Sequence, residues 1–384
     1  MLDFIVDFLE AIGINAPDRL GWVTVVLTFF IGGAVAWWFT PRTRNYSLQV
    51  GWADQPSARR LNKEPLPNAG GLAVFCAVVL AMVLATVLRR IVIEQVQVQI
   101  LAILLGGSFV MFAGFIDDQY GLSPFFRLFV QFIGALLLVG TGIRLEVTFG
   151  GDFATALTVI FTVVWVIAIT NAINLIDGID GLAGGISFIT AMSLTAVSAQ
   201  FESRAAATIL LAALAGAALG FLRHNFPPAR IIMGDSGAYF FGFVLAASAL
   251  LGNLKFTTVF ALGPVAVFLV LLFLLPLIDT LQVVFRRLLR RQNPLSSPGK
   301  DHLHHVLLDR GLSQRRTTLI MWAVTLAANV VAMWLQDMRW PVIVTTAVGT
   351  ILLLSFVVWR RTRAYRKAIK KEQSAPKPDE APAE

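Results

Sequence analysis

Apolar residues along the chain fall into eleven long runs that short polar segments separate. Each run has about the 20 residues that a helix needs to cross a bilayer. The runs are rich in small residues, which favours close helix packing and does not fit barrel strands. The pattern predicts an all-α polytopic membrane protein with about eleven transmembrane helices, at residues 22–39, 70–88, 98–116, 125–142, 157–173, 182–200, 205–222, 237–252, 258–284, 317–336 and 340–359.

The composition supports a membrane protein and narrows the metal chemistry. Hydrophobic residues make up 57% of the chain and charged residues 14%, where a soluble domain has about 25% charged residues. The single cysteine, Cys76, lies inside an apolar run, so no disulfide framework or thiolate metal site is expected. Any metal is therefore expected to have oxygen or imidazole ligands.

Positive charge orients the predicted helices. Most of the 31 Lys and Arg residues fall in alternate loops, which predicts an external N-terminus and a cytoplasmic C-terminus in the cell (inner) membrane. We expect an external interfacial segment (1–21), one transmembrane catalytic domain (22–359) and a basic, then disordered, tail (360–384). Because the basic residues gather at membrane ends, the net charge of +8 indicates anionic lipids as partners and no nucleic acid.

Unusual polar sequences lie in the loops that the charge pattern places inside. We therefore expect these loops to meet at one membrane face and to form the active site there. They cover residues 40–69, 117–124, 174–181, 223–236 and 285–316.

Three aspartates in these loops indicate a divalent cation. Asp117 and Asp118 are adjacent at the end of an apolar run, where two carboxylates repel unless a cation or headgroup water offsets their charge. Asp235 precedes a predicted helix whose first N–H groups suit a phosphate, and Mg²⁺ commonly bridges a carboxylate and a phosphate. The alternative is that Asp235 is only an N-cap.

The segment 171–185 combines amides, carboxylates and glycines. Asp177 and Asp180 can lie beside exposed N–H groups, and Asn171 and Asn174 can recognise a base or a sugar. The alternative interpretation is that the glycines pack helices and the aspartates cap one of them.

Three histidines, His302, His304 and His305, lie in a loop with many arginines, which indicates phosphate or sugar recognition. A solvated basic loop is the alternative. The histidine spacing does not fit a zinc site. We interpret His224 as structural. Asp279 either neutralises nearby arginines or joins the site.

Together, the motifs resemble one known family. In order they are Asp-x-Pro-x-x-Arg with Pro-x-Pro-x-x-Gly-Gly (Asp54–Gly71), the Asp-Asp pair, NLIDGIDGLAGG, MGDSG and HLHH. Over about residues 50–316 the chain resembles the polyprenyl-phosphate N-acetylhexosamine-1-phosphate transferases, glycosyltransferase family 4. NLIDG and HLHH are similar to the GlcNAc-1-phosphate transferase branch.

The resemblance implies Mg²⁺-dependent transfer of GlcNAc-1-phosphate from UDP-GlcNAc to a polyprenyl phosphate, with Mn²⁺ as the alternative metal. UMP would leave on the cytoplasmic side, in the first membrane step of a cell-envelope glycopolymer. A homodimer is common in relatives. The implied site residues are Asp117, Asp118 and His304 for catalysis, Asp235 and Asp118 for the metal, and Asn171, Asn174, Asp177, Asp180, His302, His305, Arg59 and Arg60 for the substrates.

Four positions depart from the family pattern. Ile232 replaces a phenylalanine that stacks on uracil, and it offers apolar surface without a ring. Ala238 replaces a frequent serine, Asn62 a frequent histidine and Asn68 a frequent arginine.

Several alternatives remain open at the level of the sequence. The donor could be another UDP-N-acetylhexosamine or UDP-MurNAc-pentapeptide, and a Mg²⁺-dependent prenyltransferase or an ion-coupled transporter would also be a multi-span bundle. A lipid phosphate is mostly dianionic at pH 7, because its second pKa is about 6, so direct attack on the β-phosphorus is favoured over an aspartyl-phosphate intermediate.

Overall fold

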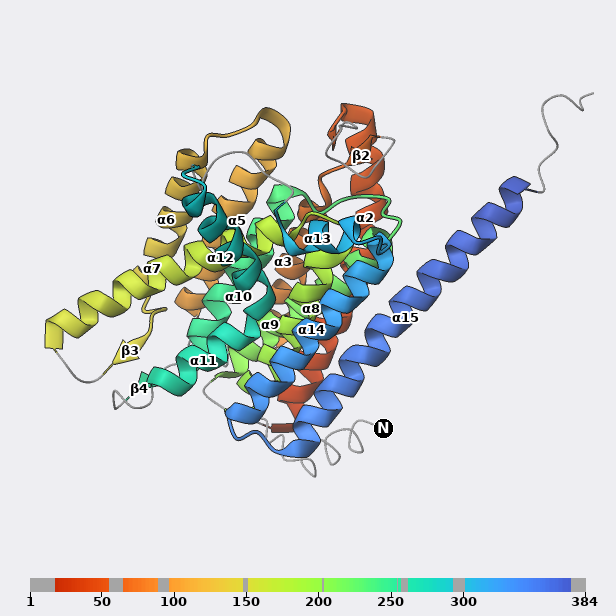
Figure 1. The fold of residues 1–384 in the computed structure, drawn as a ribbon. Coiled ribbons are helices and arrows are strands. Elements are labelled where there is room, and N and C mark those ends of the chain that lie inside the picture. Colours follow the sequence, from red (N-terminus) through yellow and green to blue (C-terminus); the bar gives the residue numbers. More distant parts are fainter. Residues whose placement is uncertain are drawn as a thin grey trace, which may run out of the picture.

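The computed structural model describes residues 18–54, 65–88, 97–147, 151–201, 204–253, 255–256, 262–292 and 301–373. The helices form one bundle, from which the end of α15 projects (Figure 1). The elements are α2 (Asp18–Val50), β1 (Ala53–Asp54), β2 (Leu66–Pro67), α3 (Gly70–Leu88), α5 (Gln97–Tyr120), α6 (Pro124–Gly140), β3 (Glu146–Val147), α7 (Gly151–Ile176), α8 (Leu182–Ser198), α9 (Ala205–Asn225), α10 (Gly234–Asn253), β4 (Lys255–Phe256), α11 (Leu262–Leu272), α12 (Leu274–Leu289), α13 (Leu303–Asp309), α14 (Gln314–Leu335) and α15 (Trp340–Gln373). Residues 1–17 and 374–384, which hold most of the predicted external segment and the predicted disordered tail, lie outside the described ranges.

The described residues of all eleven predicted apolar runs are mainly helical, which confirms a helical polytopic membrane protein. Eight helices in the described ranges are long and apolar enough to cross a membrane. The run predicted at 258–284 is not one straight helix, because α11 and α12 meet at 88° and would together form a ninth span. Helices α6 and α8 are apolar but have only 17 residues each. The number eleven and the orientation stay predictions.

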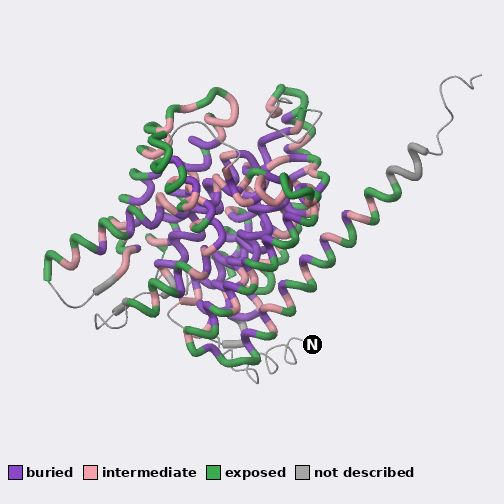
Figure 2. Tube along the Cα trace, in the orientation of Figure 1, coloured by how far each residue is buried: buried purple, intermediate pink, exposed green. Residues whose placement is uncertain are grey.

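The centre of the bundle is formed by α8, α9 and α10, which other helices surround (Figure 2). In the most apolar stretch of α10, 89% of the residues are buried, and in α9 83% are, whereas the value for α2 is 28%. Small residues allow the close contact between α2 and α9: a Cβ on Gly216 would lie 1.9 Å from the carbonyl oxygen of Phe29. Outer helices instead present apolar side chains to the surroundings.

Helix α2 continues past its predicted end at Phe39, through Pro41, as far as Val50. Proline has no N–H, so the carbonyl of Trp37 loses its usual partner within the helix. The Nε2 atom of His224 lies 3.1 Å from that carbonyl oxygen and must be the donor. This contact agrees with the interpretation of His224 as structural.

Side chains also bond the free carbonyl group at the break between α11 and α12. The carbonyl of Leu272 accepts hydrogen bonds from Asn329 Nδ2 at 3.1 Å and from Thr190 Oγ1 at 3.3 Å. The residue four positions after Leu272 is Pro276, which has no N–H. Side chains of neighbouring helices therefore supply the donors, as an irregular helix at membrane depth requires.

Helix α12 buries polar residues on one face and exposes large apolar residues on the other. Its inner face carries Asp279, Val283 and Arg287, which are buried at a spacing of four residues. Its outer face exposes large apolar side chains at residues 278, 281, 285, 288 and 289. The inner face therefore directs polar groups towards the segment that contains the histidines.

Two short sheets connect loops at the ends of the helices. β1 and β2 are antiparallel, and β3 and β4 are parallel. After β2, the chain pairs with the segment before α10: Gly70 N donates to the carbonyl of Ile232 at 3.2 Å, and Gly71 N donates to that of Met233 at 2.9 Å. The first polar loop is therefore attached to the MGDSG motif.

Candidate active site

Contacts link all five polar segments at one end of the bundle. In each segment, at least one residue that the sequence analysis names, or a neighbour of such a residue, contacts another segment. Asn68 Nδ2 donates to the main-chain oxygen of Asp118 (3.3 Å), Asp235 N donates to Asp118 (2.9 Å), Asn174 Nδ2 donates to Asp235 (2.8 Å), Gly181 N donates to Asn225 (3.0 Å), and a Cβ on Gly178 would lie 2.0 Å from His304 Nε2. The structure thus brings the segments together as predicted, whereas the cytoplasmic location of this end stays a prediction.

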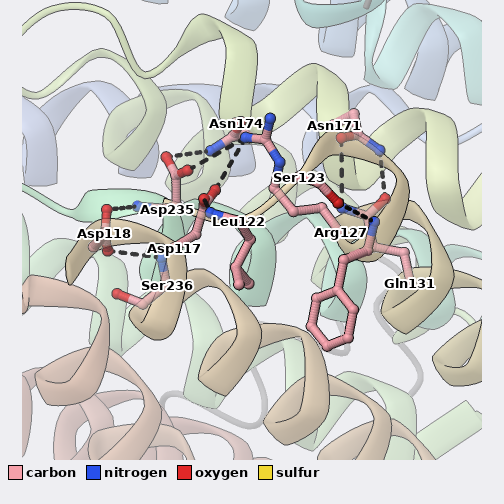
Figure 3. Close-up of polar contacts among 11 residues, drawn as sticks. Asp117, Asp118, Leu122, Ser123, Arg127, Gln131, Asn171, Asn174, Asp235 and Ser236 are labelled. Carbon is pink, nitrogen blue, oxygen red and sulfur yellow. Dashed lines mark hydrogen bonds and ion pairs between the residues drawn. The ribbon is translucent and has the colours of Figure 1, made fainter. Parts of the chain in front are cut away.

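Asp118, near the end of α5, lies against the N-terminus of α10. Its Oδ1 accepts a hydrogen bond from the N–H of Asp235 at 2.9 Å, and its Oδ2 accepts one from the N–H of Ser236 at 3.3 Å (Figure 3). A carboxylate is stabilised there by the free N–H groups and the helix dipole. Gly234 has φ +72, and a Cβ on it would lie 2.5 Å from Asp118 Oδ2. The close approach of Asp118 therefore requires glycine in the MGD motif.

Asp117 and Asp235 both face Arg127, which belongs to α6 (Figure 3). Arg127 Nη1 is 3.0 Å from Asp117 Oδ2 and 3.9 Å from Asp235 Oδ2. Asp117 also accepts a hydrogen bond from the N–H of Leu122 at 2.6 Å. The Asp117 side chain is 7% exposed and the Asp235 side chain 33%. Asp235 is therefore the carboxylate that is more open to a ligand.

Two asparagines of α7 support this cluster from the side. Asn174 donates to Asp235 Oδ1 at 2.8 Å. Asn171 donates to Gln131 Oε1, and Gln131 Nε2 donates to Asn171 Oδ1 at 3.4 Å. Gln131 lies one turn after Arg127 on α6, so Asn171 contacts the helix that positions Arg127. Of the two predicted amides, only Asn174 contacts the carboxylate cluster directly.

Negative charge exceeds positive charge in this cluster. Asp117, Asp118 and Asp235 face a single cation, Arg127, within the described residues, and that guanidinium also bonds the hydroxyl of Tyr239. Carboxylates that are close together and partly removed from water repel one another, and an added cation would offset this repulsion. The cluster is thus suited to bind a cation together with an anionic substrate.

The two aspartates of the glycine-rich loop differ in their surroundings. Asp180 is 6% exposed, and its Oδ2 accepts a hydrogen bond from the N–H of Ala229 at 2.8 Å. Its main-chain oxygen accepts one from Thr318 Oγ1 at 3.1 Å. Burial raises the pKa of Asp180, and the Ala229 N–H opposes that rise. Asp180 thus fixes the loop after α9, while Asp177 is half-buried; contacts of either with a nucleotide stay predictions.

Asp279 bonds the residues at the start of α13. His302 Nδ1 is 2.7 Å from Asp279 Oδ2, and the N–H of Leu303 donates to Asp279 Oδ1 at 2.6 Å. Both His302 and Asp279 are buried. Asp279 thus contacts the histidine segment, and its membership of a substrate site stays a prediction.

His304 is 1% exposed and packs against Gly178. Neither ring nitrogen has a hydrogen-bond partner among the described residues. Its ring centroid is 5.6 Å from that of His302 and 4.4 Å from that of His305. Burial, together with the neighbouring imidazoles, lowers the pKa of His304 to about 3, so the ring is neutral at pH 7. A substrate could reach it only if α13 and the Gly178 loop move apart, so its predicted catalytic role stays a prediction.

Sequence reasoning missed three side chains of this site, Arg127, Gln131 and Tyr239. Arg127 lies in the predicted span 125–142, and a charge inside an apolar run is itself a signal of function. Two predicted substrate contacts, Arg59 and Arg60, lie outside the described residues.

Comparison with known proteins agrees with this geometry. Residues 100–253, which contain the three clustered aspartates, match glycosyl transferase family 4. A probable undecaprenyl-phosphate N-acetylglucosaminyl 1-phosphate transferase of Bacillus subtilis is 32% identical over 321 residues, which cover 82% of this chain and 86% of that protein. The chain belongs to this family.

Other relatives place the family 4 protein in the GlcNAc-1-phosphate transferase branch. A decaprenyl-phosphate N-acetylglucosaminephosphotransferase of Mycolicibacterium smegmatis is 31% identical over 340 residues, covering 82% of each chain. An undecaprenyl-phosphate alpha-N-acetylglucosaminyl 1-phosphate transferase of Yersinia pestis is 26% identical over 309 residues, covering 76% of this chain and 78% of that protein.

The structure shows where three of the four residues that depart from the family pattern lie. Asn68 is buried and bonds the main chain of Asp118, so it supports the site from behind. Ala238 is buried within α10, and Ile232 is half-buried. Asn62 lies outside the described residues.

Replacing Gly178 with alanine is expected to lower turnover by about a hundredfold. The new Cβ would lie 2.0 Å from His304 Nε2, so the buried His304 ring, or α13 with it, must shift, and a shift of about 1 Å at a reactive site can cost about a hundredfold in rate. Gly349→Ala in α15 is the matched control, because a Cβ there meets nothing within 4 Å. Steady-state turnover of both variants tests this; equal activity would show that α13 does not position a reacting group.

Proposed function

We propose that the protein transfers GlcNAc-1-phosphate from UDP-GlcNAc to a polyprenyl phosphate, with undecaprenyl phosphate as the expected acceptor. The products are polyprenyl-diphosphate-GlcNAc and UMP, and the reaction takes place at the cytoplasmic face of the cell membrane. The activities for which the relatives are named support the reaction. The observation that carries the proposal is the cluster of Asp117, Asp235 and Arg127 at the end of the helices.

The donor set of the cluster fits Mg²⁺ bound together with a substrate. Within the described residues, no three His, Cys, Asp or Glu side chains form a ready-made metal site. Mg²⁺ usually takes only one or two carboxylates and completes its shell with phosphate oxygens and water. Asp235 and Asp117 would supply that pair once Arg127 turns away and frees Asp117 Oδ2, and Mn²⁺ accepts similar oxygen ligands. When bound, the ion would neutralise charge on the diphosphate oxygens.

Asp118 acts differently in this proposal. Both of its oxygens accept N–H groups at the start of α10, so Asp118 holds the main chain of Asp235 in place. Its predicted role as a second metal ligand would require an additional contact from the same oxygens.

Arg127 is the cation of the site that is available to an anionic substrate. Its guanidinium lies between Asp117 and Asp235 and reduces their mutual repulsion. A guanidinium binds phosphate oxygens through parallel N–H groups. We propose that Arg127 turns towards the diphosphate of the donor. The negative charge of the diphosphate would then replace that of the aspartates as its partner.

Positioning is proposed to dominate the chemistry. An oxygen of the acceptor phosphate forms a bond to the β-phosphorus of UDP-GlcNAc, and the bond from that phosphorus to UMP breaks. The acceptor phosphate needs little deprotonation at pH 7. Asp117 is held by Leu122 N–H and by Arg127, an arrangement that favours orientation of the acceptor over nucleophilic attack by Asp117 itself.

The two rival functions receive less support. The clustered carboxylates lie at helix ends, whereas the ion sites of transporters are typically near the membrane midplane. A prenyltransferase would consume a prenyl diphosphate and release no uridine nucleotide. The relatives described above are named for neither activity.

Removal of Mg²⁺ is expected to abolish the activity. Purified protein, undecaprenyl phosphate, Mg²⁺ and UDP-GlcNAc should release UMP and form a lipid diphosphate sugar, and EDTA should lower the rate at least about a hundredfold, because uncompensated diphosphate charge opposes attack. Added Mn²⁺ should restore part of the rate. UDP-MurNAc-pentapeptide and other UDP-N-acetylhexosamines serve as alternative donors. Undiminished UMP release in EDTA would refute the metal assignment, and no UMP from any donor would refute the function.

A further inference from the structure

A basic groove lies between the C-terminal end of α9 and α15. It has a volume of about 400 Å³ and is lined by Arg223, Arg360, Arg363, Ala364 and Lys367. We call it the α9–α15 groove. A second hollow of about 240 Å³ shares Arg363 and Lys367 with it and also contacts Trp359. These cations are separate from the carboxylate cluster of the proposed active site.

Positive charge in the α9–α15 groove is not balanced by carboxylates in the part of the chain that the structure describes. Within the described residues, no ion pair joins Arg223, Arg360, Arg363 or Lys367 to a carboxylate. Arg223 interacts unfavourably with Arg360, and its buried Nε has no hydrogen-bond partner in the described part of the chain. Leaving a buried donor unpaired and cations close together costs free energy. A bound anion would relieve both costs.

Aromatic side chains place the groove at a membrane boundary. Trp37, Phe356 and Trp359 are each about half exposed. The guanidinium of Arg223 lies 5.0 Å from the ring of Trp37, and that of Arg363 lies 5.5 Å from the ring of Trp359. Tryptophan beside arginine is typical of the headgroup layer. An occupant that fills this position needs a phosphate for the cations and an acyl chain for the exposed apolar surface.

We propose that the α9–α15 groove binds the headgroup phosphate of an anionic phospholipid. The phosphate would contact Arg223 on one side and Arg363 with Lys367 on the other, so the lipid would join α9 to α15. Arg361, the next residue after Arg360, donates to the main-chain oxygens of Phe226 and Pro228 in the loop that leads to α10. A lipid in this groove would therefore stabilise the contact between α15 and that loop. The proposal does not depend on the transferase activity.

The experiment measures lipid binding by the full-length protein in neutral detergent, using native mass spectrometry. Dioleoyl phosphatidylglycerol and dioleoyl phosphatidylcholine are added in turn, and the ratio of their affinities is determined. The test variant is Arg363→Gln with Lys367→Gln, and the control variant is Arg310→Gln with Arg316→Gln. All four side chains are exposed, so both variants should fold, and both lose the same charge.

We expect the wild type to prefer phosphatidylglycerol and the control variant to keep that preference. In the groove variant, the ratio of the affinities for phosphatidylglycerol and phosphatidylcholine should be about thirtyfold lower. The reason is that each basic residue near a membrane surface contributes about fivefold to binding an anionic lipid. An unchanged preference in the groove variant, or an equal loss in both variants, would overturn the proposal. Displacement of phosphatidylglycerol by millimolar inorganic phosphate would show that the groove binds phosphate without lipid and would also overturn it.

Discussion

Replacing Asp235 with asparagine is expected to lower turnover at least about a thousandfold without unfolding the protein. The Asp235 side chain is more exposed than that of Asp117, and loss of its charge removes one of the two proposed metal ligands. A contribution of about 4 kcal/mol to transition-state stabilisation corresponds to about a thousandfold in rate. The asparagine oxygen can still accept the hydrogen bond of Asn174, so the fold should persist. UMP release and the thermal unfolding midpoint measure the two effects.

Asp152→Asn is the control for this variant. Asp152 is exposed in the first turn of α7 and has no part in the cluster. Its variant should retain full activity. Activity of Asp235→Asn within tenfold of the wild type would remove Asp235 from the metal site.

Replacing Asp118 with asparagine should have a different result, namely loss of both stability and activity. An asparagine has one acceptor oxygen, and its NH₂ group would face one of the two N–H groups that now donate to Asp118. Each buried group left unsatisfied costs about 1–3 kcal/mol. The unfolding midpoint should therefore fall by a few degrees, and Asp235 would move with the start of α10.

The comparison of the two asparagine variants separates the roles of these aspartates. The proposal predicts a lower midpoint for Asp118→Asn and an unchanged midpoint for Asp235→Asn. An inactive Asp118→Asn protein with a wild-type midpoint would contradict the structural role, and it would support Asp118 as the second metal ligand.

The helical architecture could be predicted from the sequence because an apolar run of sufficient length is a local property. The exact helix limits could not be predicted. Helix α2 tolerates Pro41 because His224, far away in the sequence, bonds the freed carbonyl of Trp37. The break after α11 is tolerated because Asn329 and Thr190 bond Leu272. Both features depend on long-range contacts that hydropathy does not report.

The acidic part of the site was accessible from the sequence, because clustered carboxylates at the ends of apolar runs are costly and hence informative. Arg127 was missed because its run was assigned to the membrane as a whole. The burial of Asp180 and His304 could not be predicted, since it arises where the glycine-rich loop packs against α13 and the loop after α9. The residue types alone do not show whether these two side chains bind a ligand or hold a loop in place.

In the proposed mechanism, Asp235 and its neighbours bind a metal ion that is shared with the diphosphate of the donor. Titration calorimetry of UDP-GlcNAc binding to full-length protein, with and without Mg²⁺, tests it directly. We expect Mg²⁺ to strengthen binding to the wild type about tenfold or more and to have no effect on Asp235→Asn. Equal affinity of the wild type for UDP-GlcNAc in Mg²⁺ and in EDTA would show that no metal ion is shared with the donor.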